Sequence, residues 1–138
     1  MAGVRGVTGE AARPVVLDAS ALLAFLQSEP GSGVVESAIR GAVMSSVNWA
    51  EVVQKSLARD VMVAGMREDV EAWGLRLVPF GAEDAEAAAL LWPQTRHRGL
   101  SLADRACLAL GMRLDGPVLT ADRSWAGVPV GVEVRLIR

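Results

Sequence analysis

A chain of 138 residues with 51% hydrophobic and 22% charged residues is long enough to bury the core of one domain, and its composition excludes a disordered protein. The formal net charge of −2 excludes binding of nucleic acid through overall positive charge, so any phosphate binding must be local. No apolar run reaches the roughly 18 residues of a membrane-spanning helix. A single cysteine, Cys107, fits a reducing compartment, so we expect a cytoplasmic protein with no membrane partner.

The first elements predicted along the chain follow a polar leader, residues 1–13, which lacks the apolar core of a signal peptide. A short apolar run over 15–17 predicts a buried strand, and leucines at helical spacing predict a helix over 19–27. After a Pro-Gly turn, a second helix is expected over 34–40 and a second strand over 42–44.

The middle of the chain is predicted to be mainly helical. Serines that favour helix N-caps precede a helix ending at about residue 59, and another helix is expected over 63–73. The alternating pattern of 75–78 indicates a half-exposed strand. An alanine- and leucine-rich helix over 82–92 is then expected to be broken by Pro93.

The chain then forms one more helix, capped by Ser101 and ending at about Leu114, and two strands over 118–120 and 132–137. Strands and helices alternate throughout, which predicts an α/β sandwich with a mostly parallel sheet. The strands are short and apolar, as expected when both faces of a sheet are covered. We therefore predict one α/β domain over residues 14–138.

Four acids fall where such a fold builds ligand sites. Asp18 ends the first strand, and Asp122 lies two residues beyond the strand over 118–120. Glu51 and Asp104 lie in the first turns of two helices. Strand carboxyl ends and helix N-termini share one edge of a parallel sheet with right-handed crossovers. The four acids are therefore expected to converge at one rim.

Each acid also has a simpler structural explanation. Asp18 and Asp104 can cap or stabilise the helices that they begin. Glu51 precedes Lys55 by one helical turn and can pair with it, and Asp122 can be an ordinary turn residue. These explanations leave the shared location unexplained. Like charges that meet raise one another's pKa, and a divalent cation removes that conflict. Oxygen ligands without a His or Cys cluster favour Mg²⁺ or Mn²⁺.

Four segments around these acids resemble the motifs of PIN-domain nucleases, above all those of VapC-type toxins from bacterial toxin–antitoxin pairs. The segments are DASALLA at 18–24, SSVNWAEV at 45–52, LSLADRACLALG at 100–111 and VLTADRSW at 118–125. The resemblance extends from about Val15 to the end of the sequence. It implies a PIN-like three-layer α/β/α sandwich with a mostly parallel sheet of four to five strands.

The resemblance also implies an activity, a cofactor and partners. The expected protein is a metal-dependent endoribonuclease toxin that hydrolyses RNA phosphodiester bonds with Mg²⁺ (or Mn²⁺), forms a homodimer and is neutralised by a cognate antitoxin. Asp18 and Asp104 correspond to the metal ligands, and Glu51 and Asp122 would position waters or a second ion. By the resemblance, the catalytic residues are Asp18, Glu51, Asp104 and Asp122.

Other polar residues are predicted to support these acids. Ser20 and Thr120 match hydroxyls of the family that can hold a carboxylate or a metal water. Arg96 and Arg98, in a polar loop, and Arg123, beside the last acid, are candidates for RNA binding at the same rim. A solvated loop is the preferred explanation for the first two arginines, and an ion pair explains the third equally well.

Two other α/β families that handle phosphate do not fit. Receiver domains need a lysine after a late strand, and haloacid-dehalogenase-like phosphatases need an Asp-x-Asp start and usually a later lysine. Here Asp18 is followed by Ala19 and Ser20, and the only lysine, Lys55, lies on an early helix. Two alternatives stay open: a PIN nuclease of RNA maturation, and a non-catalytic module whose acids bind an ion or a partner's arginine.

Overall fold

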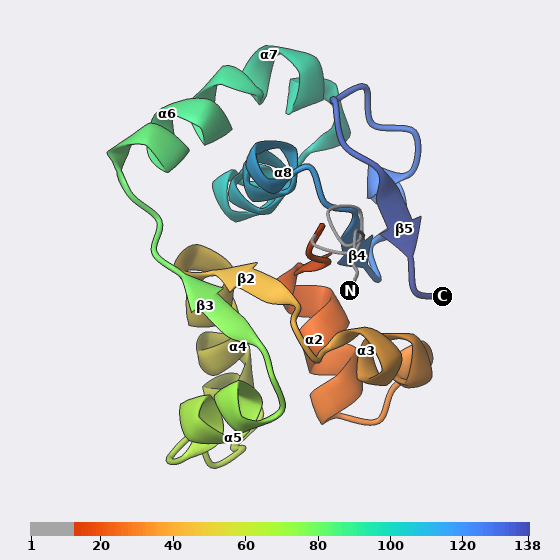
Figure 1. Ribbon diagram of the computed structural model, residues 1–138. Helices are drawn as coiled ribbons and strands as arrows, with labels where there is room; N and C mark the ends of the chain where they lie inside the picture. Colours follow the sequence, from red (N-terminus) through yellow and green to blue (C-terminus); the bar gives the residue numbers. More distant parts are fainter. Residues whose placement is uncertain (1–12) are drawn as a thin grey trace, which may run out of the picture.

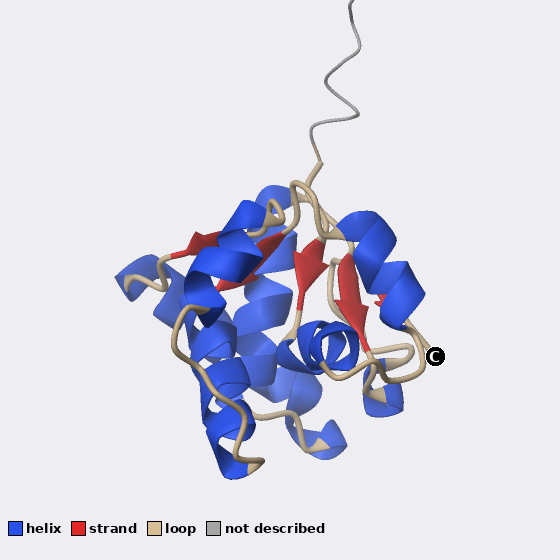
Figure 2. Ribbon diagram, turned by 90° about the horizontal axis from the view of Figure 1, so that it is seen from below, coloured by secondary structure: helices blue, strands red, loops and turns tan. Residues whose placement is uncertain are grey.

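The computed structural model describes residues 13–138, in which a parallel sheet lies between two layers of helices (Figure 1). Apart from Arg13, the predicted polar leader lies outside the described residues. The strands are short, and Figure 2 shows how much more of the chain is helix than strand. No helix within 13–138 has the length and apolar character needed to cross a membrane.

The sheet has five strands among the described residues, in the order β3-β2-β1-β4-β5, and every pairing is parallel. The prediction of four to five mostly parallel strands is therefore confirmed. β1 lies at the centre, so its carboxyl end is flanked by the ends of its two neighbours. The strands are β1 (Val16–Leu17), β2 (Val43–Ser45), β3 (Arg76–Val78), β4 (Val118–Thr120) and β5 (Val134–Leu136).

Helices cover both faces of this sheet. In Figure 1 the first group lies below the sheet and the second above it. The first group is α2 (Ala19–Leu26), α3 (Ser32–Ala38), α4 (Ser46–Ala58) and α5 (Met66–Ala72). The second group is α6 (Ala82–Leu90), α7 (Trp92–Thr95) and α8 (Leu102–Leu114). A 3-10 turn, η2 (Arg96–Arg98), lies between α7 and α8, and another, η3 (Arg123–Trp125), follows β4.

Each face of the sheet has its own hydrophobic core, because successive strand residues point to opposite sides. Leu17 and Met44 pack with α2, α3, α4 and α5, whereas Val16 and Val43 pack with α6 and α8. All four side chains are at most 1% exposed. Full burial of such a side chain contributes roughly 1.5–3 kcal/mol. The predicted three-layer α/β/α sandwich is confirmed.

Element boundaries differ from the sequence prediction where backbone conformation decides them. The helix predicted over 63–73 begins only at Met66, because Gly65 precedes it in the left-handed region (φ 82°). Gly31 likewise precedes α3 with φ 94°, and a Cβ there would lie 2.7 Å from the Ile137 carbonyl oxygen. Pro93 does not end the helical region but lies in the first turn of α7, where the missing N–H has no intrahelical partner.

Candidate active site

Asp18 follows β1 directly and is the N-cap of α2. Its Oδ1 accepts a hydrogen bond of 2.9 Å from the backbone N–H of Ala21, which satisfies one of the free amides of the helix start. Asp18 is only 5% exposed. The cap predicted as the simpler explanation is therefore present, but an ordinary helix cap lies at the surface, and this one is buried in the centre of the sheet edge.

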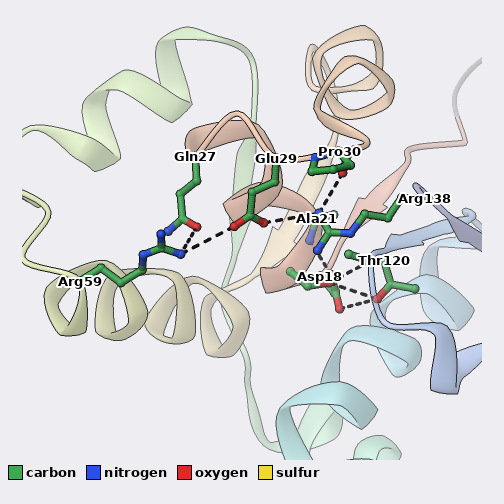
Figure 3. Close-up of polar contacts among 10 residues, drawn as sticks. Asp18, Ala21, Gln27, Glu29, Pro30, Arg59, Thr120 and Arg138 are labelled. Atoms are coloured by element: carbon green, nitrogen blue, oxygen red, sulfur yellow. Dashed lines mark hydrogen bonds and ion pairs between the residues drawn. The ribbon is translucent and has the colours of Figure 1, made fainter.

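Two hydroxyl groups hold the Asp18 carboxylate. Ser20 Oγ donates to Oδ1 at 2.7 Å, and Thr120 Oγ1, at the end of the neighbouring β4, donates to Oδ2 at 2.8 Å. Each hydroxyl also accepts a backbone N–H, from Ala121 at 2.9 Å and from Asp122 at 3.0 Å. Figure 3 shows Asp18 and Thr120 joined in this way. These contacts fix the carboxylate in one orientation across two strands.

Burial raises the pKa of Asp18 from 3.8 to about 6, because the charged form loses its hydration. The hydrogen bonds from Ser20, Ala21 and Thr120 oppose this shift, and the negative charge of Asp104 adds to it. Such a carboxyl group is costly to ionise in the absence of a positive charge nearby. A shifted pKa of this kind marks a candidate functional group.

Glu51 was predicted in the first turn of its helix, but α4 begins at Ser46 and places Glu51 in the second turn. The side chain is half-buried, and its carboxylate is held by Asn48, a residue that the sequence prediction missed. The Asn48 amide donates to Glu51 Oε1 at 3.1 Å and to the Ala103 carbonyl of α8 at 3.0 Å. Asn48 is 1% exposed. It thus connects the helix of Glu51 to the residue that precedes Asp104. Its position one helical turn before Glu51 was the only sequence signal for this role.

Asp104 forms the predicted capping box of α8 with Ser101. Asp104 Oδ2 accepts from the Ser101 backbone N–H at 2.9 Å, and Ser101 Oγ accepts from the Asp104 N–H at 3.1 Å. The half-buried carboxylate is also close enough to Asp18 to raise its pKa. The capping explanation and the convergence of charges are therefore both present at this residue.

Cys107, buried and free in the second core, reports where three of the acids lie. Burial raises the pKa of its thiol well above the usual value, and the charges of Asp18, Asp104 and Glu51 raise it further. The three carboxylates come from the end of β1 and from two helices that pack on each other. All three carboxylates therefore lie near enough to Cys107 for their charges to act on its thiol.

Asp122 is exposed and lies at the margin of this group. It caps η3, where its Oδ1 accepts from the Ser124 N–H at 2.9 Å and from the Ser124 hydroxyl at 2.7 Å. Its own backbone N–H donates to the Thr120 hydroxyl that holds Asp18. Asp122 therefore has the predicted turn role, and it is linked to the buried Asp18 through one residue, Thr120.

The donor set fits a hydrated divalent cation and does not fit an all-protein metal cage. Within residues 13–138 no three His, Cys, Asp or Glu side chains are grouped closely enough to hold a metal ion. Asp18 and Asp104 are coupled through their charges, however, and Mg²⁺ usually takes one or two carboxylates and keeps several waters. A cation between these two acids would also relieve the cost of ionising Asp18.

The three arginines predicted to bind RNA have different surroundings. The Arg98 guanidinium donates to the carbonyls of Ser124, Ala126 and Gly127, at 3.3, 2.9 and 3.1 Å. Arg96 lies over the ring of Trp92, 5.3 Å from its centroid. Arg123 is exposed beside Asp122. Arg98 therefore fastens η2 to the loop after η3, and its donors are largely used within the chain.

The comparisons with known proteins identify the class. The PIN domain family matches residues 15–130, and the chain belongs to this family. A search of curated proteins found no match.

Several solved structures share the fold. A toxin–antitoxin complex from Klebsiella pneumoniae has a TM-score of 0.71 at 17% identity, with 90% of this chain and 98% of that chain covered. VapBC2 from Rickettsia felis, bound to a promoter DNA fragment, has a TM-score of 0.64 at 13% identity, with 88% of this chain and 97% of that chain covered. FitAcB from Neisseria gonorrhoeae has a TM-score of 0.63 at 18% identity, with 87% of this chain and 95% of that chain covered. At these identities the likeness extends to the fold alone.

Proposed function

We propose that this PIN-domain protein is a metal-dependent endoribonuclease whose catalytic residues are Asp18, Glu51, Asp104 and Asp122. The observation that carries the proposal is the buried Asp18 carboxylate, held by two hydroxyls, with its pKa raised to about 6 and the charge of Asp104 contributing to that rise. A fold gains nothing in stability from such a pair, so a ligand that needs both acids is the simplest reason for it.

Asp18 and Asp104 would hold Mg²⁺ (or Mn²⁺) in this proposal. When bound, the ion supplies positive charge for the phosphodiester and acidifies a water molecule. Ser20 and Thr120 keep the Asp18 oxygens in place by donating to them. Their hydrogen bonds favour the charged carboxylate, which is the form that binds a cation.

The other two acids would act on water and on the outer part of the substrate. Glu51 is half-buried and is kept in place by the Asn48 amide, so it can orient a water or accept its proton. Asp122 is more exposed and begins the η3 turn, where it would position water at the rim of the centre. Hydrolysis at this rim requires a strand that can reach it, which favours single-stranded RNA over a duplex.

The test of this activity is cleavage of a labelled single-stranded RNA by the purified chain. We expect internal cleavage in Mg²⁺ or Mn²⁺. A chelator that removes the metal should abolish this cleavage, and adding the metal back should restore it. Cleavage that persists in chelator would show that the acids are not a metal centre. A folded protein that binds Mn²⁺ but never cleaves RNA would favour the non-catalytic module.

We further propose that the chain is the toxin of a toxin–antitoxin pair, acts in the cytoplasm as a homodimer and is neutralised by a cognate antitoxin. The support is the fold shared with toxin–antitoxin and VapBC structures over nearly their whole chains. Exposed apolar side chains on α6 and α7, including Leu90 at 76% and Trp92 at 49%, could lie in a protein interface. The alternative is a PIN nuclease of RNA maturation.

Expression in a bacterial host separates the toxin from the maturation enzyme. A toxin arrests growth when it is expressed alone, and the arrest is relieved by co-expression of the gene next to its own. A maturation nuclease leaves growth unaffected at the same level of expression. Asp104→Asn serves as the control, because it should remove the arrest without changing the amount of protein.

A further inference from the structure

A cavity of about 340 Å³ opens beside the acidic centre, between α2 and α4. One wall is formed by Ser20 and Leu23 of α2 and its C-cap Gln27, and the other by Lys55 in the last turn of α4 and its C-cap Arg59. The volume is at the lower end of the range of small-ligand sites. The cavity is therefore large enough for part of a nucleotide and too small for a folded partner.

Basic residues from distant parts of the sequence line this cavity. Lys55 comes from α4, Arg59 is its C-cap residue, and Arg138 comes from the segment after β5. Glu29 has the one acidic side chain among the lining residues, so the lining side chains together carry a charge of +2. In a chain whose net charge is −2, this is a local concentration of positive charge.

The pairing inside the cavity is weak. Arg59 lies 3.7 Å and Arg138 lies 3.5 Å from the Glu29 carboxylate oxygens, both longer than the 2.7–2.9 Å of a good charged hydrogen bond. Figure 3 shows the two guanidinium groups on either side of that carboxylate. Lys55 takes part in none of the ion pairs formed within residues 13–138. Arg59 Nη1 also donates to Gln27 Oε1 at 2.8 Å, and Arg138 Nη1 donates to the Pro30 carbonyl at 2.9 Å. The other guanidinium nitrogens of both arginines have no hydrogen-bond partner within residues 13–138, so they and the Lys55 ammonium keep donors available for an anion.

The cavity borders the acidic centre at Ser20, although none of the four acids lines it. Ser20, which lines it, also donates to the Asp18 carboxylate. Glu51 and Lys55 lie four residues apart on α4, and Arg59 follows four residues later as the C-cap, so each is about 6 Å further along the same side of the helix. A helical turn of this length is comparable with the separation of neighbouring phosphates in an extended single strand. A strand held at the acids would thus bring its next phosphates to these cations.

We propose that Lys55, Arg59 and Arg138 form a phosphate-binding pocket for the RNA backbone next to the scissile bond. The inference rests on the proposed ribonuclease function and adds to it the contacts that keep the strand in the centre. Guanidinium forks match phosphate oxygens, and a lysine adds a point charge. Glu29 lowers the affinity of the pocket and orients both arginines in the absence of RNA.

The experiment measures binding of a labelled single-stranded RNA by fluorescence anisotropy in chelator, so that cleavage is not needed. The variant K55Q/R59Q should raise the Kd about tenfold. It should also reduce the slope of log K against log salt by about 1.4, since each lost phosphate contact on a single strand is worth about 0.7. Glu29→Gln should lower the Kd several-fold, because it removes the one opposing charge.

The matched control is R13Q/R113Q, which removes the same charge from exposed sites outside the cavity. It should bind RNA within about twofold of the unmodified chain at 0.1 M salt. Unfolding curves of all variants exclude loss of structure as the cause.

Three results would overturn the proposed pocket. The first is that K55Q/R59Q binds RNA as tightly as the control, and the second is that the unmodified chain binds no RNA. The third is that binding of a glutamate-rich peptide depends on Lys55 and Arg59 while binding of RNA does not. The last result would assign the cavity to a protein partner. RNA binding that depends on the pocket without cleavage in Mg²⁺ would contradict the nuclease proposal and leave the pocket standing. If the unmodified chain cleaves RNA in Mg²⁺ but the pocket variants bind RNA normally, the pocket is wrong and the nuclease proposal stands.

Discussion

At the scale of single residues, the burial of Asp18 is the feature with the most consequences. The side chain is 5% exposed, yet it accepts three hydrogen bonds from Ser20, Ala21 and Thr120. Hydrogen bonds favour its charged form, while burial and Asp104 oppose it. Because burial prevails, the metal-free protein is under electrostatic strain at this carboxyl group.

This strain predicts a pH dependence of stability. The pKa of Asp18 is about 6 in the folded chain, and 3.8 is the ordinary value of an aspartate, which we take for the unfolded chain. Between pH 4 and 6 the unfolded chain has released a proton that the folded chain keeps, so the free energy of unfolding falls as pH rises, by up to about 3 kcal/mol. Above pH 6 both states are ionised and this contribution is constant.

Asp18→Asn removes the titrating group, and its amide oxygen can still accept from Ser20 and Ala21. The variant should gain stability relative to the unmodified chain as pH rises from 4 to 7. The measurement is urea unfolding in chelator at both pH values. A difference between the two proteins that does not change with pH would mean that Asp18 is not strained.

Asn48 is predicted to position Glu51. Asn48→Ala removes the donor to Glu51 and to the Ala103 carbonyl, which should lower the free energy of unfolding by about 1–3 kcal/mol. It should also lower kcat for RNA cleavage more than it changes KM, since Glu51 would lose its orientation. Asn48→Asp should be worse than Asn48→Ala, because a second carboxylate would face Glu51. Equal kcat in all three proteins would leave Asn48 a purely structural residue.

At the scale of elements, the site depends on how helix starts and strand ends are fastened together. Asn48 connects α4 to α8, Thr120 connects β4 to β1, and Arg98 connects η2 to the loop after η3. The Arg98 guanidinium serves three carbonyls that lie just beyond Asp122. The turn that begins at Asp122 is therefore fastened by an arginine far from it in sequence.

Arg98→Ala should loosen this loop. We expect faster amide hydrogen exchange over residues 122–128 and a fall in the free energy of unfolding of about 1 kcal/mol, since the contacts are partly exposed. Arg98→Lys should restore little, because an ammonium cannot serve three carbonyls in a fixed fork. Unchanged exchange in Arg98→Ala would show that the loop is held by other contacts.

Much of this arrangement could be predicted from local sequence. Apolar runs gave the strands, and serine caps gave the starts of α4 and α8, because both signals act over a few residues. The start of α5 was missed because Gly65 sets it through backbone conformation, which no side-chain pattern reports. Asn48 and Lys55 were missed as parts of the site because their contacts depend on how α4 packs against α8 and α2.

At the scale of the whole molecule, the sheet order places the site. β1 is central and has β2 and β4 as neighbours, so α2 and α4, which follow β1 and β2, start at the same edge. The acids were predicted to converge there. The charges of Asp18, Glu51 and Asp104 all act on the Cys107 thiol, and Asp122 is more exposed. The strands that end at this edge pack into two buried cores, one on each face, which support the proposed metal site from both sides.

The most direct test of the account is the rate of RNA cleavage in Mg²⁺ by Asp104→Asn, compared with Asp115→Asn. Each substitution removes one acid: Asp104 lies in the first turn of α8 at the site, and Asp115 is the C-cap at the opposite end of the same helix. Asp115 has a left-handed backbone conformation, which Asn tolerates. We predict a loss of more than about 100-fold for Asp104→Asn and none for Asp115→Asn, with both proteins folded. A folded Asp104→Asn protein that cleaves RNA at the unmodified rate would contradict the metal centre.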